Sequence, residues 1–245
     1  MTENYFNYFT EIEDHFQRAR GTGLFLLSPL DWALIESWKE AGVPLEAALN
    51  GIERAFAKFA RRPKPFRKVN GLGYCVQTVM QAAEELAAAV REGGARPAGA
   101  ADRQVEPGFT PDQIADFLER NAEALEKSSG RWRAAGQTEI AAVAADLAEA
   151  AAAVRAAIAL APEAASDGRD LENTLSAVED KLTASVTRAA TLEQLTEIRR
   201  EFERSLAPYR QRMSVLQIEL LERQFLKKRL YEHFGIPRLS LFYCL

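Results

Sequence analysis

Apolar residues recur every three or four positions along almost the whole chain, and that period is the period of an α-helix. Residues 5–16 and 45–59 are two clear examples, each with large apolar side chains on one helical stripe. No stretch shows the alternation of apolar and polar residues that marks a half-buried strand, and only residues 239–245 could be extended. The sequence therefore predicts an all-α protein.

Two helix starts are marked by the same kind of residues. Ser28 can cap a helix that begins at Pro29, with the negative charge of Asp31 in its first turn. Thr110 can cap a second helix, with Pro111 in the first position and Gln113 completing a capping box. Both signals place a helix start to within about one residue, so these two ends are the best-determined element boundaries in the sequence.

One segment interrupts the helical pattern and predicts a domain boundary. Residues 93–108 read GGARPAGAADRQVEPG, which has no apolar stripe and is rich in Gly, Ala and Pro. Such a composition is typical of a linker. The prediction is a compact N-terminal helical domain over residues 1–92, followed by a C-terminal antiparallel helical bundle over residues 109–245.

The last helical stretch, residues 191–233, is the longest and carries a heptad register. Its first seam consists of Leu195, Phe202, Tyr209 and Leu216, and its second of Leu206, Met213 and Leu220. Two interpretations remain open: a seam within a helical hairpin or bundle, and a coiled coil with another chain. Pro208 lacks an amide hydrogen, so we expect it to kink or restart this long last helix.

Residues that carry catalysis are scarce. The 245 residues include two histidines and two cysteines, and no zinc-protease, P-loop, dinucleotide-binding or di-iron motif is present. Cys75 lies in an apolar helical run, which favours a buried thiol over a nucleophile. We therefore expect a non-enzymatic protein without a metal or a cofactor, and an enzyme with an unfamiliar site is the remaining alternative.

The strongest functional signal is a basic stretch over residues 54–68. It contains seven cations and one interleaved aromatic residue among its members, with no acid: Arg54, Lys58, Arg61, Arg62, Lys64, Phe66, Arg67 and Lys68. Clustered cations bind phosphates, and an aromatic side chain can stack on an unpaired base. The stretch is either a contact surface for DNA or RNA or a solvated helix end, where cations are also favoured.

The C-terminal residues are unusually apolar. Leu239, Leu241, Phe242 and Tyr243 lie in a final segment of seven residues without a charged side chain. Exposed, such a segment would favour aggregation. It therefore either folds back into a groove of its own chain or binds a partner protein or a second copy.

Neither the first residues nor the most apolar region indicates a membrane. The N-terminal sequence lacks the basic and apolar regions of a signal peptide, and residues 140–160 include Asp146, Glu149 and Arg155. We expect a cytoplasmic protein without a membrane partner.

Two segments in the first third resemble a known family. SPLDWALIESWKEAGVPLEAALNGIERAF, at residues 28–56, and VNGLGYCVQTVM, at residues 69–80, are similar to the helical domain of DnaD-like primosome and phage replication proteins. Ile35 and Trp38 match the first family motif, and Asn70 and Tyr74 match the start of the second. The second motif departs further along, where Ala82 stands in the place of a tryptophan. The resemblance implies DNA binding and assembly with replication partners.

Together these features favour a non-enzymatic binding or assembly protein that contacts nucleic acid through residues 54–68. The alternative is a helical scaffold that binds protein through the heptad seam of residues 191–233 and the apolar tail.

Overall fold

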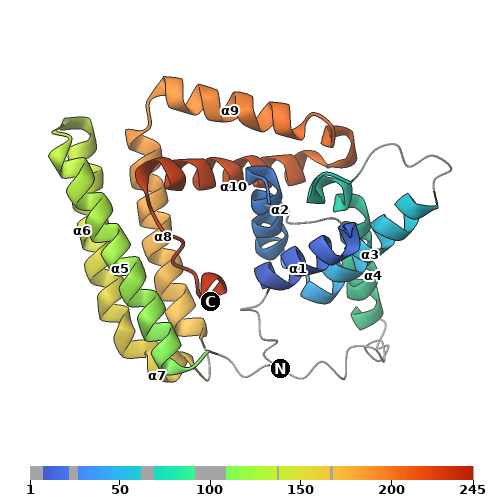
Figure 1. The fold of residues 1–245 in the computed structure, drawn as a ribbon, viewed down its shortest axis with the longest axis horizontal. Helices are drawn as coiled ribbons and strands as arrows, with labels where there is room; N and C mark the ends of the chain where they lie inside the picture. Colours follow the sequence, from blue (N-terminus) through green and yellow to red (C-terminus); the bar gives the residue numbers. More distant parts are fainter. Residues whose placement is uncertain are drawn as a thin grey trace. The chain divides into compact units, whose positions relative to one another are not determined.

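The computed structural model describes residues 8–21, 27–61, 69–91, 109–136, 138–165 and 168–244. Over these residues the chain forms helices joined by turns and contains no strand (Figure 1). The predicted all-α class is confirmed. The chain divides into two compact units, each built from two segments: unit 1 comprises Met1–Val105 and Ile198–Leu226, and unit 2 comprises Glu106–Glu197 and Lys227–Leu245.

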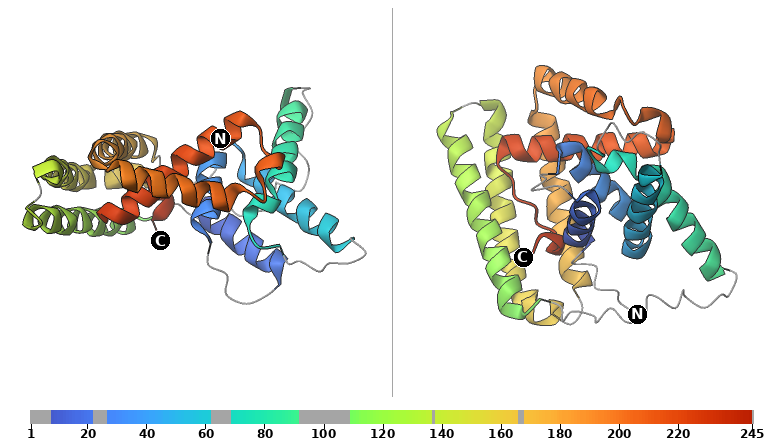
Figure 2. Two further views of the ribbon diagram at one scale, coloured as in Figure 1. Left: turned by 90° about the horizontal axis from the view of Figure 1, so that it is seen from above. Right: turned by 45° about the vertical axis from the view of Figure 1, so that its right-hand side comes forward.

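Unit 1 is built on four helices from the first part of the chain. They are α1 (Tyr8–Arg20), α2 (Pro29–Glu40), α3 (Leu45–Ala60) and α4 (Val76–Arg91), with the short 3-10 helix η2 (Leu72–Tyr74) before α4. Helix α3 lies beside both α1 and α4 (Figures 1 and 2). It approaches α4 closely at Gly51, where a Cβ atom would lie 2.3 Å from the Cα atom of Val79. Glycine at this position therefore permits close packing of the two helices.

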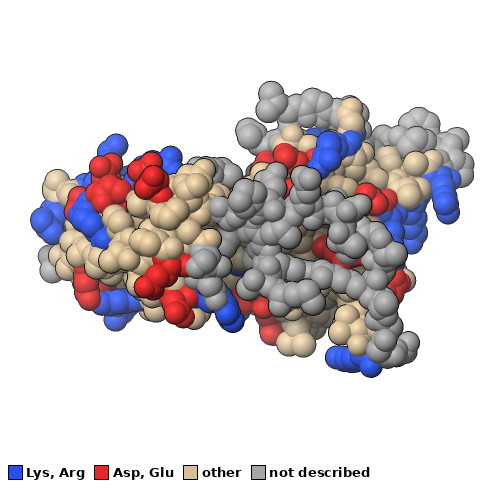
Figure 3. Space-filling model, turned by 90° about the horizontal axis from the view of Figure 1, so that it is seen from below, with Lys and Arg blue, Asp and Glu red and all other residues tan. Residues whose placement is uncertain are grey.

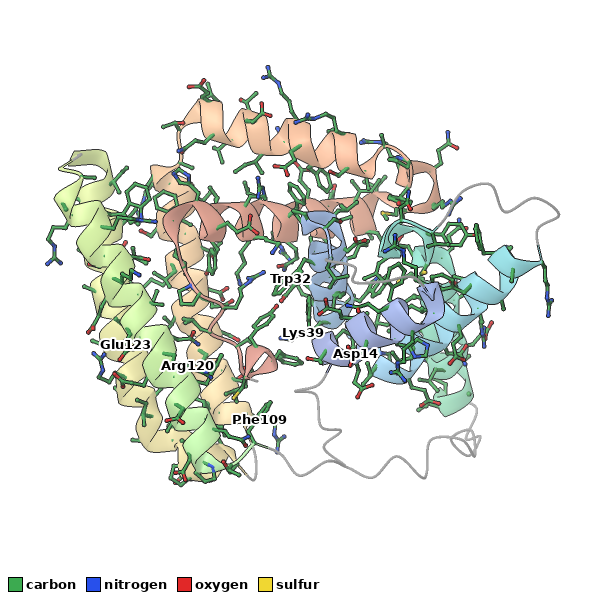
Figure 4. All side chains as sticks on the ribbon, viewed as in Figure 1. Asp14, Trp32, Lys39, Phe109, Arg120 and Glu123 are labelled. Carbon is green, nitrogen blue, oxygen red and sulfur yellow. The ribbon has the colours of Figure 1, made fainter. Side chains whose placement is uncertain are left out.

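The apolar stripe of α1 supplies much of this core. Ile12 and Phe16 are fully buried, and Phe9 stacks on Trp32 of α2 with ring centroids 4.1 Å apart. Trp32 is labelled in Figure 4. The helical period of the first residues thus marks the face that enters the core.

The start of α2 has the predicted cap. The Ser28 hydroxyl accepts a hydrogen bond from the Asp31 amide, and the Asp31 carboxylate accepts one from the Ser28 amide. This reciprocal pair is a capping box, and Pro29 occupies the first turn as expected.

Residues 191–233 do not form one continuous helix, and the break expected at Pro208 is present. The chain instead forms α9 (Leu192–Leu206), the 3-10 helix η4 (Arg210–Arg212) and α10 (Val215–Phe234). Pro208 follows the end of α9, and its missing amide hydrogen explains why the helix does not continue. The two helices run antiparallel as a hairpin (Figures 1 and 2). The division into units falls within both α9 and α10.

Residues Ile198–Leu226 of this hairpin belong to unit 1, which differs from the predicted single bundle over residues 109–245. These residues contact the earlier part of the chain: the Gln224 side-chain amide donates to Glu40 over 2.6 Å, and Tyr209 packs against Gly73. Within the hairpin, Phe202 and Phe225 pack with ring centroids 5.4 Å apart. The two units are therefore not consecutive stretches of sequence, because the hairpin packs with the N-terminal helices in unit 1.

Unit 2 is a helical bundle. Its helices are α5 (Pro111–Ala134), α6 (Thr138–Ala157), α7 (Ala161–Ala164), α8 (Arg169–Ala189) and the 3-10 helix η3 (Ile158–Leu160), together with the end of α10 and η5 (Leu241–Tyr243). Helix α6 packs against both α5 and α8. The predicted capping box of Thr110 and Gln113 is present at the start of α5. Within the described part of the chain, no helix combines the length and the apolar character needed to cross a membrane.

Candidate nucleic-acid interface

Two members of the predicted basic stretch, Arg54 and Lys58, lie on the second half of α3, and Arg61 is the C-cap residue that follows it. Arg54 is exposed and pairs with Glu85 of α4, with 2.6 Å between the guanidinium nitrogen and the carboxylate oxygen. Lys58 and Arg61, at the C-terminal end of α3, are both exposed. The other predicted residues lie outside the described part of the chain: Arg62, Lys64, Phe66, Arg67 and Lys68. In the face shown by Figure 3, Lys and Arg side chains gather at the right-hand end, where α3 ends.

An aromatic pair joins the C-terminal end of α3 to η2. Phe59 of α3 meets Tyr74 of η2 edge to face, with ring centroids 6.0 Å apart and planes at 85°. Both residues are half-buried. The last turn of α3 therefore carries both exposed positive charge at Lys58 and a partly exposed aromatic residue at Phe59.

The turn between α9 and α10 adds a third group. The guanidinium carbon of Arg212 lies 5.0 Å from the centroid of the Tyr74 ring, which is a cation–π contact. Arg212 is also half-buried. We call the group formed by Lys58, Phe59, Arg61, Tyr74 and Arg212 the α3–η4 surface.

Two glycines explain how η2 supports this surface. A Cβ atom on Gly73 would lie 2.6 Å from a ring carbon of Tyr209, so only glycine lets this ring pack directly on the backbone. A Cβ on Gly71 would lie 2.7 Å from a carboxylate oxygen of Asp31. The two glycines of the motif Gly71-Leu72-Gly73 thus allow Asp31 of α2 and Tyr209, which precedes η4, to pack closely against the backbone of this turn.

Asp31 fixes η2 to the start of α2. One of its carboxylate oxygens accepts from the Leu72 amide over 2.6 Å, and the other accepts from the Ser28 amide and hydroxyl. The carboxylate is only 2% exposed, and burial raises its pKa above the ordinary value although these hydrogen bonds oppose the shift. Asp31 therefore links the start of α2 to η2, the 3-10 helix that carries Tyr74.

The thiol of Cys75 lies in the same buried region. Burial raises the pKa of Cys75 far above its ordinary value, and the charge of Asp31 adds to the shift. A thiol of this kind is protonated at neutral pH and is a poor nucleophile. Burial and the same carboxylate also raise the pKa of Tyr209. Across the described residues, no three His, Cys, Asp or Glu side chains are grouped so that they could hold a metal ion.

The apolar tail lies within unit 2. Leu239 and Leu241 are fully buried, Phe242 is 6% exposed, and Tyr243 is half-buried. Two carboxylates of α8 hold the tail backbone: Glu179 accepts from the Leu239 amide over 2.8 Å and Glu172 from the Leu241 amide over 2.9 Å. The tail folds back onto its own unit, so these side chains belong to its core and not to an exposed docking surface.

Glu179 also forms a buried ion pair. The Lys227 ammonium lies 2.6 Å from one of its oxygens, and the Tyr231 hydroxyl donates to its backbone carbonyl. Burial alone would raise the pKa of Glu179, but Lys227 and Arg238 together hold it below its ordinary value. The charge at Glu179 is thus retained inside the bundle.

The heptad seam does not continue through the hairpin. Phe202 and Leu206 are buried, whereas Leu216 is 77% exposed. The turn that follows α9 interrupts the register between these positions, and Arg199 pairs with Glu222 across the two antiparallel helices. The interpretation as a hairpin seam therefore describes residues 198–206 and 215–226.

The surface of unit 2 carries mixed charge. In Figure 3, acidic and basic side chains are interspersed over the left-hand part, which contains α5 and α6. A shallow hollow on α5 is lined by Gln113, Asp116, Glu119, Arg120 and Glu123. Arg120 and Glu123 are labelled on this helix in Figure 4. Three acids against one cation make this hollow a poor site for phosphate.

Sequence reasoning found Lys58, Arg61 and the neighbourhood of Tyr74, but it missed Tyr209 and Arg212 as members of this region. Both lie in residues 191–233, which the heptad pattern assigns to the C-terminal bundle. A signal was present in Pro208, because a helix break places the residues that follow it in a turn.

Comparison with known proteins gives one match. A family model described as "Uncharacterised protein" matches residues 7–94, which include α1–α4 and η2 but not Arg212. Neither the curated proteins nor the solved structures contain a match to the chain.

Proposed function

We propose that this protein is a non-enzymatic nucleic-acid-binding protein and that the α3–η4 surface, with the basic stretch that follows α3, is its contact surface. The observation that carries this proposal is the half-buried Phe59–Tyr74 pair with the Arg212 guanidinium over the Tyr74 ring, at the end of the helix that carries the exposed Lys58. Cations give affinity for phosphates, and aromatic faces give contacts to bases.

The local charge supports the same function. The net charge of the chain is −4, yet residues 54–68 contain seven cations and no acid. Arg54 is held by Glu85, so Lys58 and Arg61 are the described members of the stretch best placed for phosphates. A locally positive surface on an acidic protein directs nucleic acid to one place.

The resemblance to DnaD-like replication proteins supports the proposal from a different direction. Tyr74 is one of the residues that carry the resemblance, and it lies at the centre of the α3–η4 surface. Under this proposal the family-like segment and the contact surface are the same part of the molecule.

The test is a salt titration of binding. Fluorescence anisotropy with labelled single- and double-stranded DNA and RNA gives the dissociation constant from about 50 mM to 200 mM salt, over which phosphate contacts weaken strongly. The double variant Lys58→Gln, Arg61→Gln should bind more weakly. The slope of log affinity against log salt should fall by about 1.4, because each lost contact to a single strand removes about 0.7.

A matched control removes the same two charges elsewhere. Lys127 and Arg133 are exposed residues of α5 in unit 2, and the variant Lys127→Gln, Arg133→Gln should keep the affinity and slope of the natural protein. The proposal fails if no nucleic acid binds at about 50 mM salt, where phosphate contacts are strong, or if both double variants have the same effect.

A further inference from the structure

We propose that the ligand of the α3–η4 surface is a single-stranded nucleic acid, and that one unpaired base stacks on the guanidinium of Arg212. This inference rests on the proposed function and names the form of nucleic acid that the surface selects. It assigns two different tasks to the cations, since Lys58 and Arg61 contact phosphates while Arg212 contacts a base.

Arg212 combines a cation–π contact with partial exposure. A guanidinium is planar, and in RNA and single-strand recognition bases stack on such planes as they do on aromatic rings. The guanidinium carbon of Arg212 lies over the Tyr74 ring, 5.0 Å from its centroid. Arg212 is half-buried, so part of its surface is in contact with solvent. A base on that surface would extend the existing stack by one member.

The stack is held in place before any ligand arrives. Tyr74 contacts Phe59, and η2 is bonded to Asp31 through the Leu72 amide. Tyr209, three residues before Arg212, packs on the backbone of Gly73. Since three separate segments fix Tyr74 and the η4 turn, binding requires little ordering of the protein, and this lowers the cost of association.

The geometry selects single strands over duplexes. In a duplex each base is stacked on its neighbours, and its faces are not accessible without unstacking. Phosphate contacts at Lys58 and Arg61 do not distinguish the two forms, because both carry the same backbone. The preference must therefore come from the stacking group, which is Arg212 on Tyr74.

Unit 2 contains a comparable pair that serves as a control. The guanidinium carbon of Arg131 lies 4.8 Å from the ring centroid of Trp132. This pair is part of the contact between α5 and the end of α10, since Trp132 donates to the Phe234 carbonyl and Arg131 to the His233 carbonyl. A change at Arg131 removes a cation–π contact of the same type without touching the α3–η4 surface.

The experiment compares Arg212→Lys with Arg131→Lys, both of which keep the positive charge and remove the planar group. Affinity of the full chain is measured for single-stranded DNA, single-stranded RNA and a duplex of the same sequence. A single strand carrying 2-aminopurine adds a direct readout, because the fluorescence of this base falls when it stacks. The natural protein should prefer single strands and quench 2-aminopurine.

Arg212→Lys should weaken single-strand binding about 5- to 150-fold, the range for loss of one stacked base. Its affinity for the duplex and the salt slope should stay the same, and quenching should be lost. Arg131→Lys should bind like the natural protein. Circular dichroism melts verify that both variants are folded.

Equal affinity for duplex and single strand, with no effect of Arg212→Lys, would overturn this inference and leave the proposed function standing. Absence of binding to every nucleic acid would overturn both. A larger preference for RNA than for DNA would support the inference and add a contact to the 2′-hydroxyl, which distinguishes the two.

Discussion

Asp31 in unit 1 and Glu179 in unit 2 are both buried carboxylates that accept a hydrogen bond from the backbone of a distant segment. They differ in their other partners. Asp31 accepts from Ser28 and from backbone amides, whereas Glu179 has the Lys227 ammonium at 2.6 Å. The pKa of Asp31 is raised by burial, and that of Glu179 is held low by the cations.

The comparison shows what a nearby cation changes. Neutral donors only partly offset the cost of burying a carboxylate, and a cation at hydrogen-bond distance can offset it completely. Both carboxylates join segments that lie far apart in the chain. The consequences for stability therefore differ in size and in their dependence on pH.

The largest effect is expected from removing the cation at Glu179. Lys227→Met should lower the free energy of local unfolding of unit 2 by about 3 kcal/mol, the lower end for breaking a buried pair, since the Lys227 side chain is 17% exposed. Hydrogen exchange of the tail amides after α10 measures this. The control is Lys181→Met, which breaks an exposed pair with Glu149 of the same 2.6 Å length and should cost about 0–1 kcal/mol. Equal losses in the two variants would contradict the distinction between buried and exposed pairs.

A smaller effect is expected at the carboxylate without a lysine partner. Asp31→Asn turns one acceptor into a donor that faces the Ser28 amide, and it should destabilise unit 1 by about 2 kcal/mol. Exchange of the Leu72 amide should accelerate accordingly. Asp112, an exposed first-turn aspartate of α5, is the matched position, and Asp112→Asn should change stability by less than about 1 kcal/mol. Slow exchange at Leu72 in the Asp31 variant would show that its amide has another acceptor.

The smallest effect is the opposite pH dependence of the two sites. The pKa of Asp31 is raised on folding, so the stability that Asp31 contributes is fully present below pH 3.8, its ordinary pKa, and is lost as pH rises through the folded pKa. The pKa of Glu179 is lowered on folding, so the stability that Glu179 contributes is present above pH 4.5, its ordinary pKa, and is lost as pH falls through the folded pKa. The cost of Asp31→Asn should therefore shrink as pH rises from acid, and that of Glu179→Gln should grow. Hydrogen exchange of each variant and the natural protein across this range checks both signs. A common trend in both variants would show that one of the two pKa directions is reversed.

Local signals in the sequence predicted local structure well. The capping boxes at Ser28 and Thr110 are both present, and the apolar stripes of α1 and α3 face the core. These features depend on residues within four positions of one another. Their physical cause is therefore visible without knowledge of the fold.

Contacts between distant segments were not predictable in the same way. Nothing in the neighbourhood of Gly73 indicates that Tyr209 packs on it, and nothing near Glu179 indicates Lys227 as its partner. The heptad register runs past Pro208, and only the proline itself indicates the break between α9 and α10. For the α3–η4 surface, the cations at the end of α3 are predictable because they lie within a few positions of one another, whereas Arg212 is not because it comes from a distant part of the chain.

The membership of residues 198–226 in unit 1 has a consequence for synthesis of the chain. During translation residues 8–91 of unit 1 leave the ribosome before residues 106–197 of unit 2, and Tyr209 and Arg212 of unit 1 leave it after them. Residues 198–226 can therefore pack onto the earlier segment of unit 1 only after residues 106–197 have been translated. N-terminal domains commonly fold first during translation. Here an N-terminal fragment that ends at the linker would lack residues 198–226, which complete the core of unit 1. Each unit is built from two segments that alternate along the chain, so neither unit can be removed as one contiguous fragment.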